Sequence, residues 1–391
     1  MIGLFSFDGP MYRDCNGVYC NTTITSEMFS RYFQVVDKLI VVIRTLHLDK
    51  TYKEANLQKV ELNGLQFIEI PNLNSIHGFL KDKPKYKKLI GEQVEKADLI
   101  FARMPSVISD ITIHFARKMK KKYMVEVGGC AWDAYWNHGL IGKLIAPYMF
   151  FNEVKGVKHA TFASYVTEKW LQERYPCNCP SVSASNVYLD KNEKSVLEQR
   201  INKIKTKSKD SKIIIGTVAA VNVRYKGQEY IIRAISELNK QGYNFEYELV
   251  GGGDTSYLKK ISKKLGVEDK VRFKGLLLRS DVFKWLDSID IYAQPSKQEG
   301  LPRALIEALS RGCPAIGSTT AGIPELLQTK TVFRNGNINQ ICDILKMLVT
   351  TDLREIAKCN FEKAKEYELV HLESKRNKIY EQYKVQCLYK L

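Results

Sequence analysis

The sequence has few features of secreted or membrane-spanning proteins. No stretch reaches the ~18 uncharged apolar residues that a membrane-spanning helix needs, and the nearest, 139–151, is interrupted by Lys143. The apolar residues 1–7 lack a basic leader and run into Asp8, so they predict a buried strand rather than a signal peptide. We therefore expect a cytoplasmic protein that meets a membrane only at its surface.

Cysteine pairs with the spacing of metal sites are also lacking. The nine cysteines include no C-x-x-C pair, and only Cys177 and Cys179 lie close together. An odd number of scattered thiols disfavours a zinc site or a disulfide framework and is typical of a reducing compartment.

The size and charge of the chain narrow its class. At ~150 residues per domain, 391 residues predict two or three domains. The 60 Lys and Arg exceed the 43 Asp and Glu and give a formal charge of +17. This excess favours a polyanionic partner: nucleic acid, an acidic membrane or a phosphate-bearing ligand. Because the aromatic residues do not interleave with Lys and Arg in a known module, we expect no nucleic acid.

Short apolar, β-branched runs alternate with amphipathic segments, which predicts βαβ units and two open parallel sheets. The expected strands are 1–7, 38–43, 65–70, 99–102, 123–127 and 160–163, then 212–218, 245–250, 271–274, 289–294, 315–318 and 332–333. Helices are expected near 228–241, 257–266 and 303–311.

The polar stretch 189–211 has little apolar periodicity after Val196, so we place a domain boundary near residue 205. The predicted domains are 1–205, 206–368 and a terminal helix, 369–391, that crosses back to the first domain. One face of that helix carries Leu372, Ile379, Tyr380 and Tyr383.

The most informative segment is 289–327. An apolar strand ends there, a turn at Gly300 follows, and Pro302 sits in the expected first turn of a helix that Gly312 ends. The amides around Gly300 and Leu301 would lie at the positive end of the helix dipole, which favours an anion.

Glu299 and Glu307 flank this helix start, eight positions apart. Carboxylates beside an anion site would repel phosphate, so we expect them to accept hydrogen bonds from sugar and ribose hydroxyls. Each taken alone would be a solvated acid.

This segment resembles the family-4 retaining glycosyltransferases of GT-B fold, which share Glu, seven residues, Glu in a P-S-x-x-E-G context. Further matches give the resemblance a span of roughly 212–328: 216–218 with 225–227, 249–254, 271–275 and 322–325. It implies two Rossmann-like open sheets facing across a cleft. It also implies that Glu299 binds the donor sugar and Glu307 the ribose, with Gly252 and Gly275 at the donor site.

Arg224 and Lys226 would stabilise the charge that a departing nucleoside diphosphate gains, more in the transition state than before it. They would replace a metal, and the sequence has no Asp-x-Asp pair with which to hold one.

The first half offers weaker candidates. Gly17, in the expected loop 8–17, resembles the family's glycine loop, although a plain turn fits as well. Asp133 follows a predicted strand and would face acceptor or donor, or else cap a helix; relatives place a histidine earlier than His138 stands here.

Three basic clusters, 81–88, 117–122 and 203–212, fit either solvated faces or an anionic membrane. Trp136, Leu140, Leu144 and Tyr148 share a helical face, for which we expect a place in the core, with membrane contact as the alternative.

Together these features predict a retaining, metal-independent glycosyltransferase of surface polysaccharide or glycolipid assembly. It would need no cofactor, use a UDP or GDP sugar, and act on a hydroxyl acceptor, possibly lipid-linked, at the inner membrane face. The alternatives are a nucleotide-sugar 2-epimerase of the same fold and a basic nucleic-acid-binding protein.

Overall fold

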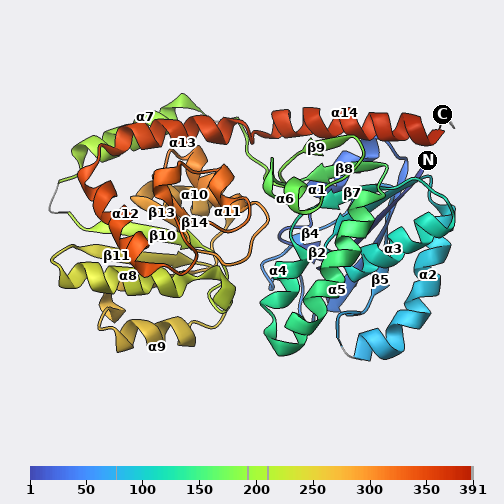
Figure 1. Ribbon diagram of the computed structural model, residues 1–391, viewed down its shortest axis with the longest axis horizontal. Helices are drawn as coiled ribbons and strands as arrows, with labels where there is room; N and C mark the ends of the chain where they lie inside the picture. The colour runs from blue at the N-terminus through green and yellow to red at the C-terminus, as the bar shows by residue number, and fades with distance from the viewer. Residues whose placement is uncertain (76, 192, 209–210, 389–391) are drawn as a thin grey trace. The chain divides into compact units, whose positions relative to one another are not determined.

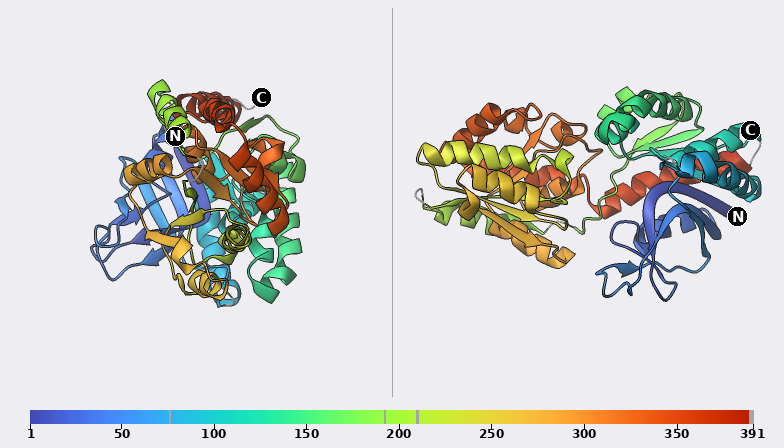
Figure 2. Two further views of the ribbon diagram at one scale, coloured as in Figure 1. Left: turned by 90° about the vertical axis from the view of Figure 1, so that its left-hand side faces the viewer. Right: turned by 90° about the horizontal axis from the view of Figure 1, so that it is seen from below.

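The computed structural model describes residues 1–75, 77–191, 193–208 and 211–388. It forms two compact units: unit 1 comprises 1–184 and 373–391, and unit 2 comprises 185–372. In each unit, helices flank a central sheet (Figure 1, Figure 2). None of the described helices is both long and apolar enough to cross a membrane.

Unit 1 is built on a nine-stranded sheet with a parallel core. The parallel strands are β1 (Ile2–Arg13), β3 (Lys38–His47), β5 (Leu65–Ile70), β6 (Leu99–Met104), β7 (Met124–Val127), β8 (Phe162–Tyr165) and β9 (Ser181–Ser183). Two short strands, β2 (Tyr19–Asn21) and β4 (Gln58–Lys59), extend it antiparallel.

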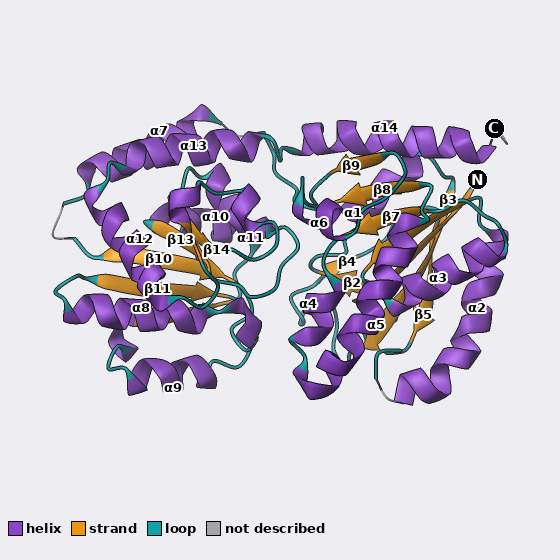
Figure 3. Cartoon of the chain, viewed as in Figure 1, coloured by secondary structure: helices purple, strands orange, loops and turns teal. Residues whose placement is uncertain are grey.

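Helices cover this sheet (Figure 3). They are α1 (Ser26–Ser30), α2 (Lys83–Lys96), α3 (Val107–Lys118), α4 (Ala131–Trp136), α5 (Gly139–Lys158), α6 (Trp170–Arg174) and α14 (Leu369–Leu388). Helix α3 packs on β1 and β6 and contacts both α2 and α5. From Glu373 onward α14 belongs to unit 1, where Tyr380 and Tyr383 are fully buried.

Unit 2 contains a six-stranded parallel sheet in the order β12-β11-β10-β13-β14-β15. Its strands are β10 (Ile213–Val218), β11 (Phe245–Val250), β12 (Val271–Gly275), β13 (Ile291–Gln294), β14 (Ala315–Ser318) and β15 (Val332–Phe333). Its helices are α7 (Lys194–Thr206), α8 (Gln228–Lys240), α9 (Ser256–Lys264), α10 (Arg279–Ser288), α11 (Arg303–Ser310), α12 (Ile338–Thr350) and α13 (Leu353–Lys365).

The division between the units lies at 184/185, earlier than the expected residue 205. The polar stretch that suggested a linker contains α7, which packs on α13 of unit 2. A buried arginine, Arg200, holds this helix through bonds to the carbonyls of Leu286, Ile289 and Arg311. Arg200 is the buried residue of this helix, whereas Leu197, Ile201 and Ile204 are only half-buried. Its apolar face is therefore weak, and the sequence suggested a linker instead. Lys209, in the third basic cluster, lies outside the described residues.

The segment 8–17, which was expected to form a loop, belongs largely to a strand. Asp8, Gly9 and Pro10 lie within β1, which continues to Arg13 past an irregularity in its pairing with β3. Only the last part turns back, into β2.

Candidate functional site

The first part of the site is the segment between β13 and α11. Pro302 is extended and precedes the helix as its N-cap, one position earlier than expected, and no side chain caps the first turn. Gly312, with φ +58°, follows the helix end as predicted. The first amides of α11 thus keep their donors for another partner.

Glu299 lies in this segment and has two partners. Its Oε1 accepts hydrogen bonds from Lys226 Nζ at 2.7 Å and from Gln294 Nε2 at 3.1 Å. The side chains of Lys226 and Glu299 are only 22% and 11% exposed, so this ion pair is partly shielded from water. The structure therefore brings together two of the predicted residues.

Glu307 lies in the second turn of α11. Burial raises the pKa of this carboxyl, although the charges of Arg303 and Arg279 act in the opposite direction. Within the described part of the chain, no residue donates a hydrogen bond to its carboxylate. A half-buried acid of this kind remains available to a ligand hydroxyl.

Both acids lie close to Tyr292. Burial raises the pKa of this tyrosine well above its usual range, and the charges of Glu299 and Glu307 raise it further. Its hydroxyl hydrogen-bonds to Gln294 Oε1 at 3.0 Å. Gln294 thus joins Tyr292 to Glu299, and Glu307 acts on the same tyrosine through its charge.

The segment after β10 packs against this site. It carries the short helix η3 (Arg224–Lys226) and then Gly227, which has φ +72°. A Cβ on Gly227 would stand 2.0 Å from the carbonyl oxygen of Pro295, so only glycine allows this approach. The amide of Lys297 donates to the carbonyl of Tyr225 at 2.7 Å and locks the two segments together.

Arg224 differs from Lys226 in its surroundings. It is exposed, and its guanidinium lies 4.3 Å from the ring centroid of Tyr257. Stacking on an aromatic ring orients the cation without neutralising it, so its charge remains available to an anion.

The predicted glycines Gly252 and Gly275 lie in neighbouring turns at the same sheet edge. The carbonyl of Gly252 accepts from Val221 at 3.0 Å, and that of Gly275 accepts from Gly251 at 2.9 Å. On the other side of the site, the carbonyl of Gly300 accepts from Gly322 at 3.0 Å, and Leu301 is buried. These glycine bonds tie together the turns at the carboxyl ends of β10, β11 and β12, the usual ligand edge of an open α/β sheet.

Sequence reasoning missed Gln294, Tyr292 and Tyr257. Gln294 is 2% exposed and links Glu299, Tyr292 and Ser296. A polar residue at the end of a buried strand was the available signal for it. Nothing in the local sequence indicated that Tyr257, on α9, would reach Arg224.

The two predicted residues of unit 1 have structural partners. Gly17, with φ +81°, makes the turn between β1 and β2, where its amide donates to the carbonyl of Asp14. Asp133 is the third residue of α4, and burial raises the pKa of its carboxyl while a hydrogen bond from Cys130, the N-cap, lowers it. His138 is exposed and precedes α5.

Two α/β units built on parallel strands, with a polar site at the carboxyl edge of the second, define the GT-B class of fold. A sequence profile described as "Glycosyl transferases group 1" matches residues 198–360. Protein CapJ of Staphylococcus aureus is 31% identical over 361 residues, which are 90% of this chain and 88% of CapJ. The chain therefore belongs to this family and is a glycosyltransferase.

Another relative is a glycosyltransferase by name, and a solved structure shares the fold. The amylovoran biosynthesis glycosyltransferase AmsK of Erwinia amylovora is 36% identical over 110 residues, 26% of this chain and 27% of AmsK. Among solved structures, Anabaena HepE in complex with UDP superposes with a TM-score of 0.66 over 98% of this chain and 100% of HepE, at 15% identity.

Proposed function

We propose that the protein is a retaining, metal-independent glycosyltransferase that moves a sugar from a nucleoside diphosphate to a hydroxyl acceptor. The observation that carries this proposal is the cluster of Lys226, Glu299 and Glu307 beside the uncapped start of α11. The UDP bound by HepE and the biosynthetic role in the name of AmsK support a UDP sugar and surface polysaccharide assembly.

The residues divide the donor between them. The amides at the start of α11, with Arg224 and Lys226, hold the diphosphate. Glu307 accepts hydrogen bonds from the ribose hydroxyls, and Glu299 accepts one from the sugar. Before the donor arrives, Glu299 neutralises Lys226, so neither charge is left partly buried and alone.

The transfer step keeps its charges balanced. The bond between the anomeric carbon and the diphosphate oxygen breaks, and the acceptor oxygen bonds to that carbon on the same face. The acceptor proton passes to the departing phosphate. Arg224 and Lys226 meet the negative charge that develops on the leaving group, which is the role a divalent ion has in other transferases.

We place the acceptor on unit 1 and propose that it is lipid-linked and presented at an anionic inner membrane face. The net charge of +17 and the apolar surface of α5 support this placement.

A thermal-shift screen with UDP, GDP, ADP and dTDP sugars tests the donor site. One nucleotide class, most simply UDP, should stabilise the wild type but not Glu307→Ala. The matched control is Glu268→Ala, because Glu268 is an exposed acid of unit 2 that precedes the amino end of β12, opposite the carboxyl edge where the candidate site lies. Folded wild-type protein that responds to none of these sugars would contradict the proposal.

A further inference from the structure

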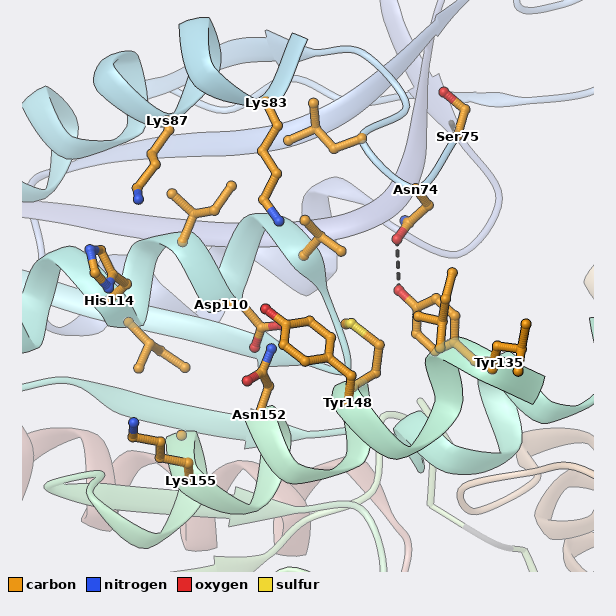
Figure 4. A pocket seen from close by; sticks show the side chains of 18 of the residues that line it. Asn74, Ser75, Lys83, Lys87, Asp110, His114, Tyr135, Tyr148, Asn152 and Lys155 are labelled. Carbon is orange, nitrogen blue, oxygen red and sulfur yellow. Dashed lines mark hydrogen bonds between the residues drawn. The ribbon is translucent and has the colours of Figure 1, made fainter. Parts of the chain in front are cut away.

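A groove of about 620 Å³ lies within unit 1 between α2, α3 and α5. Figure 4 shows side chains of all three helices turned into it. The pieces of chain that line it all belong to unit 1, so it is separate from the candidate site of unit 2.

The wall formed by α5 is apolar and open to solvent. Leu144, Tyr148, Ile141 and Ile145 line the groove and are 82%, 57%, 59% and 38% exposed. The shared helical face expected in the core is not formed, because Trp136 ends α4 whereas Leu140, Leu144 and Tyr148 lie on α5. All four side chains are exposed instead. A continuous exposed apolar surface of this kind marks a contact with a partner or a membrane.

One end of the groove is cationic. In Figure 4, Lys87, His114 and Lys155 gather there. Lys87, Arg117 and Lys155 line the groove with His114, and burial together with the charges of these cations and of Lys118 lowers the pKa of His114. Lys87, Arg117 and Lys155 are exposed, and no described carboxylate forms an ion pair with them.

The opposite end is polar. Tyr135 donates a hydrogen bond to Asn74 Oδ1 at 2.7 Å (Figure 4). Asp110 lies near this end, and burial together with the charge of Asp8 raises the pKa of its carboxyl to about 8. At neutral pH the Asp110 carboxyl therefore keeps its proton and adds no negative charge to the groove.

We propose that this groove binds one anionic phospholipid of the membrane, with the phosphate at Lys87, Arg117 and Lys155 and an acyl chain along Ile145 and Ile111. The proposal deepens the membrane attachment proposed above and rests on it. The exposed face of α5 would enter the interfacial layer while the cations hold the headgroup.

The direction of the helices favours a bilayer lipid over the sugar acceptor. Arg117 and Lys155 lie in the last turns of α3 and α5, just before the chain enters β7 and β8. They therefore stand near the amino ends of the strands. An acceptor is expected at the carboxyl ends, where the ligands of open α/β sheets bind.

Native mass spectrometry of the full chain with phosphatidylglycerol or phosphatidylcholine tests the groove. The wild type should retain one phosphatidylglycerol and little phosphatidylcholine. Lys87→Glu should weaken retention at least about five-fold, the effect of one interfacial charge. Lys88→Glu is the matched control because Lys88 is an exposed neighbour that does not line the groove.

A second pair of variants separates the groove from surface adsorption. Ile145→Trp should fill the groove and abolish lipid retention, whereas Leu140→Trp, on the same helix but outside the groove, should not. Equal loss in Lys87→Glu and Lys88→Glu, or full retention in Ile145→Trp, would overturn the groove site. Flotation with phosphatidylglycerol vesicles distinguishes the groove from membrane attachment in general. If Ile145→Trp still binds vesicles and still retains lipid, membrane attachment stands but the groove is not the site. If the wild type does not float with the vesicles, both proposals are wrong.

Discussion

At the scale of single residues, the candidate site depends on how closely two backbone segments approach. Gly227 allows the segment after β10 to touch the carbonyl of Pro295, and this contact sets where Lys226 meets Glu299. Gly227, which has no side chain, thus positions the charged residues Lys226 and Glu299. The geometry is fixed by sterics before any ligand is present.

Gly227→Ala should destabilise unit 2 and abolish its response to sugar nucleotides. Alanine at positive φ costs about 1–2 kcal/mol, and its Cβ would clash with a backbone oxygen that side-chain rotation leaves in place. Gly242→Ala is the control, since Gly242 has φ +90° but no atom within 4 Å of its Cβ. Urea unfolding measures both, and equal losses with donor response intact in Gly227→Ala would contradict the steric argument.

Lys226→Met should lower the transfer rate by about 10²–10³, the usual effect of losing one fixed group that stabilises developing charge. Binding of the donor should weaken less than the rate, because the charge grows as the bond breaks. Lys240→Met provides the comparison, since Lys240 is 62% exposed and lies at the end of α8. Steady-state kinetics distinguishes kcat from KM, and a change confined to KM would argue against the catalytic role.

At the scale of elements, α7 shows how a polar helix is held in place. Arg200 donates to three carbonyls at the ends of α10 and α11, at 2.6, 2.7 and 3.2 Å. These carbonyls lie where helices end and have no partner within the helix, although Lys203 Nζ also donates to that of Ile289 at 2.7 Å. One buried guanidinium thus joins α7 to two helices of unit 2.

Arg200→Met should lower the free energy of unfolding by about 3 kcal/mol, because charge-assisted hydrogen bonds are lost and buried carbonyls remain unpaired. Lys205→Met changes an exposed cation on the same helix and should have an effect within about 0.5 kcal/mol. Chemical denaturation compares the two variants, and equal midpoints would show that α7 does not depend on this arginine.

The observed elements show which features of the fold and the site could be predicted from the sequence. Strands such as β5 and β11 were predicted with their observed bounds because apolar residues recur at least at every second position of a short run. The pairing of Lys226 with Glu299, 73 positions apart, needed the fold. The exposure of α5 was missed because an apolar helix face looks the same whether protein or another partner covers it.

At the scale of the whole molecule, unit 1 buries two glutamates in opposite states. Burial alone would raise the pKa of Glu126, but Arg31 and Arg103 lower it to about 2, with further bonds from Tyr380 and Tyr32. For Glu153 burial is the larger effect and raises the pKa to about 8, although a bond from Ala131 and the charge of Arg174 act in the opposite direction. Its Oε2 accepts from Ala131, while Oε1 is buried without a described partner.

These two groups should make the stability of unit 1 depend on pH in opposite directions. Glu126 binds its proton less readily in the folded state than unfolded, so its contribution is lost as the pH falls from about 4.5 towards 2. Glu153 keeps its proton longer when folded, so stability should fall as the pH rises from about 4.5 to 8. Glu153→Gln, a neutral replacement, should make the alkaline limb shallower and be more stable than wild type at pH 8. Asp110, whose pKa burial also raises to about 8, supplies the rest of that limb.

Urea midpoints of the full chain measured from pH 3 to pH 9 test this expectation. Glu126→Gln should lose stability at neutral pH by roughly 3–5 kcal/mol, because Arg31 and Arg103 would remain buried without their carboxylate. Glu173→Gln is the control, since Glu173 is an exposed acid of unit 1. If Glu153→Gln followed the wild type in parallel across the alkaline range, the proton on Glu153 would not be the cause, because no other group changes in that variant.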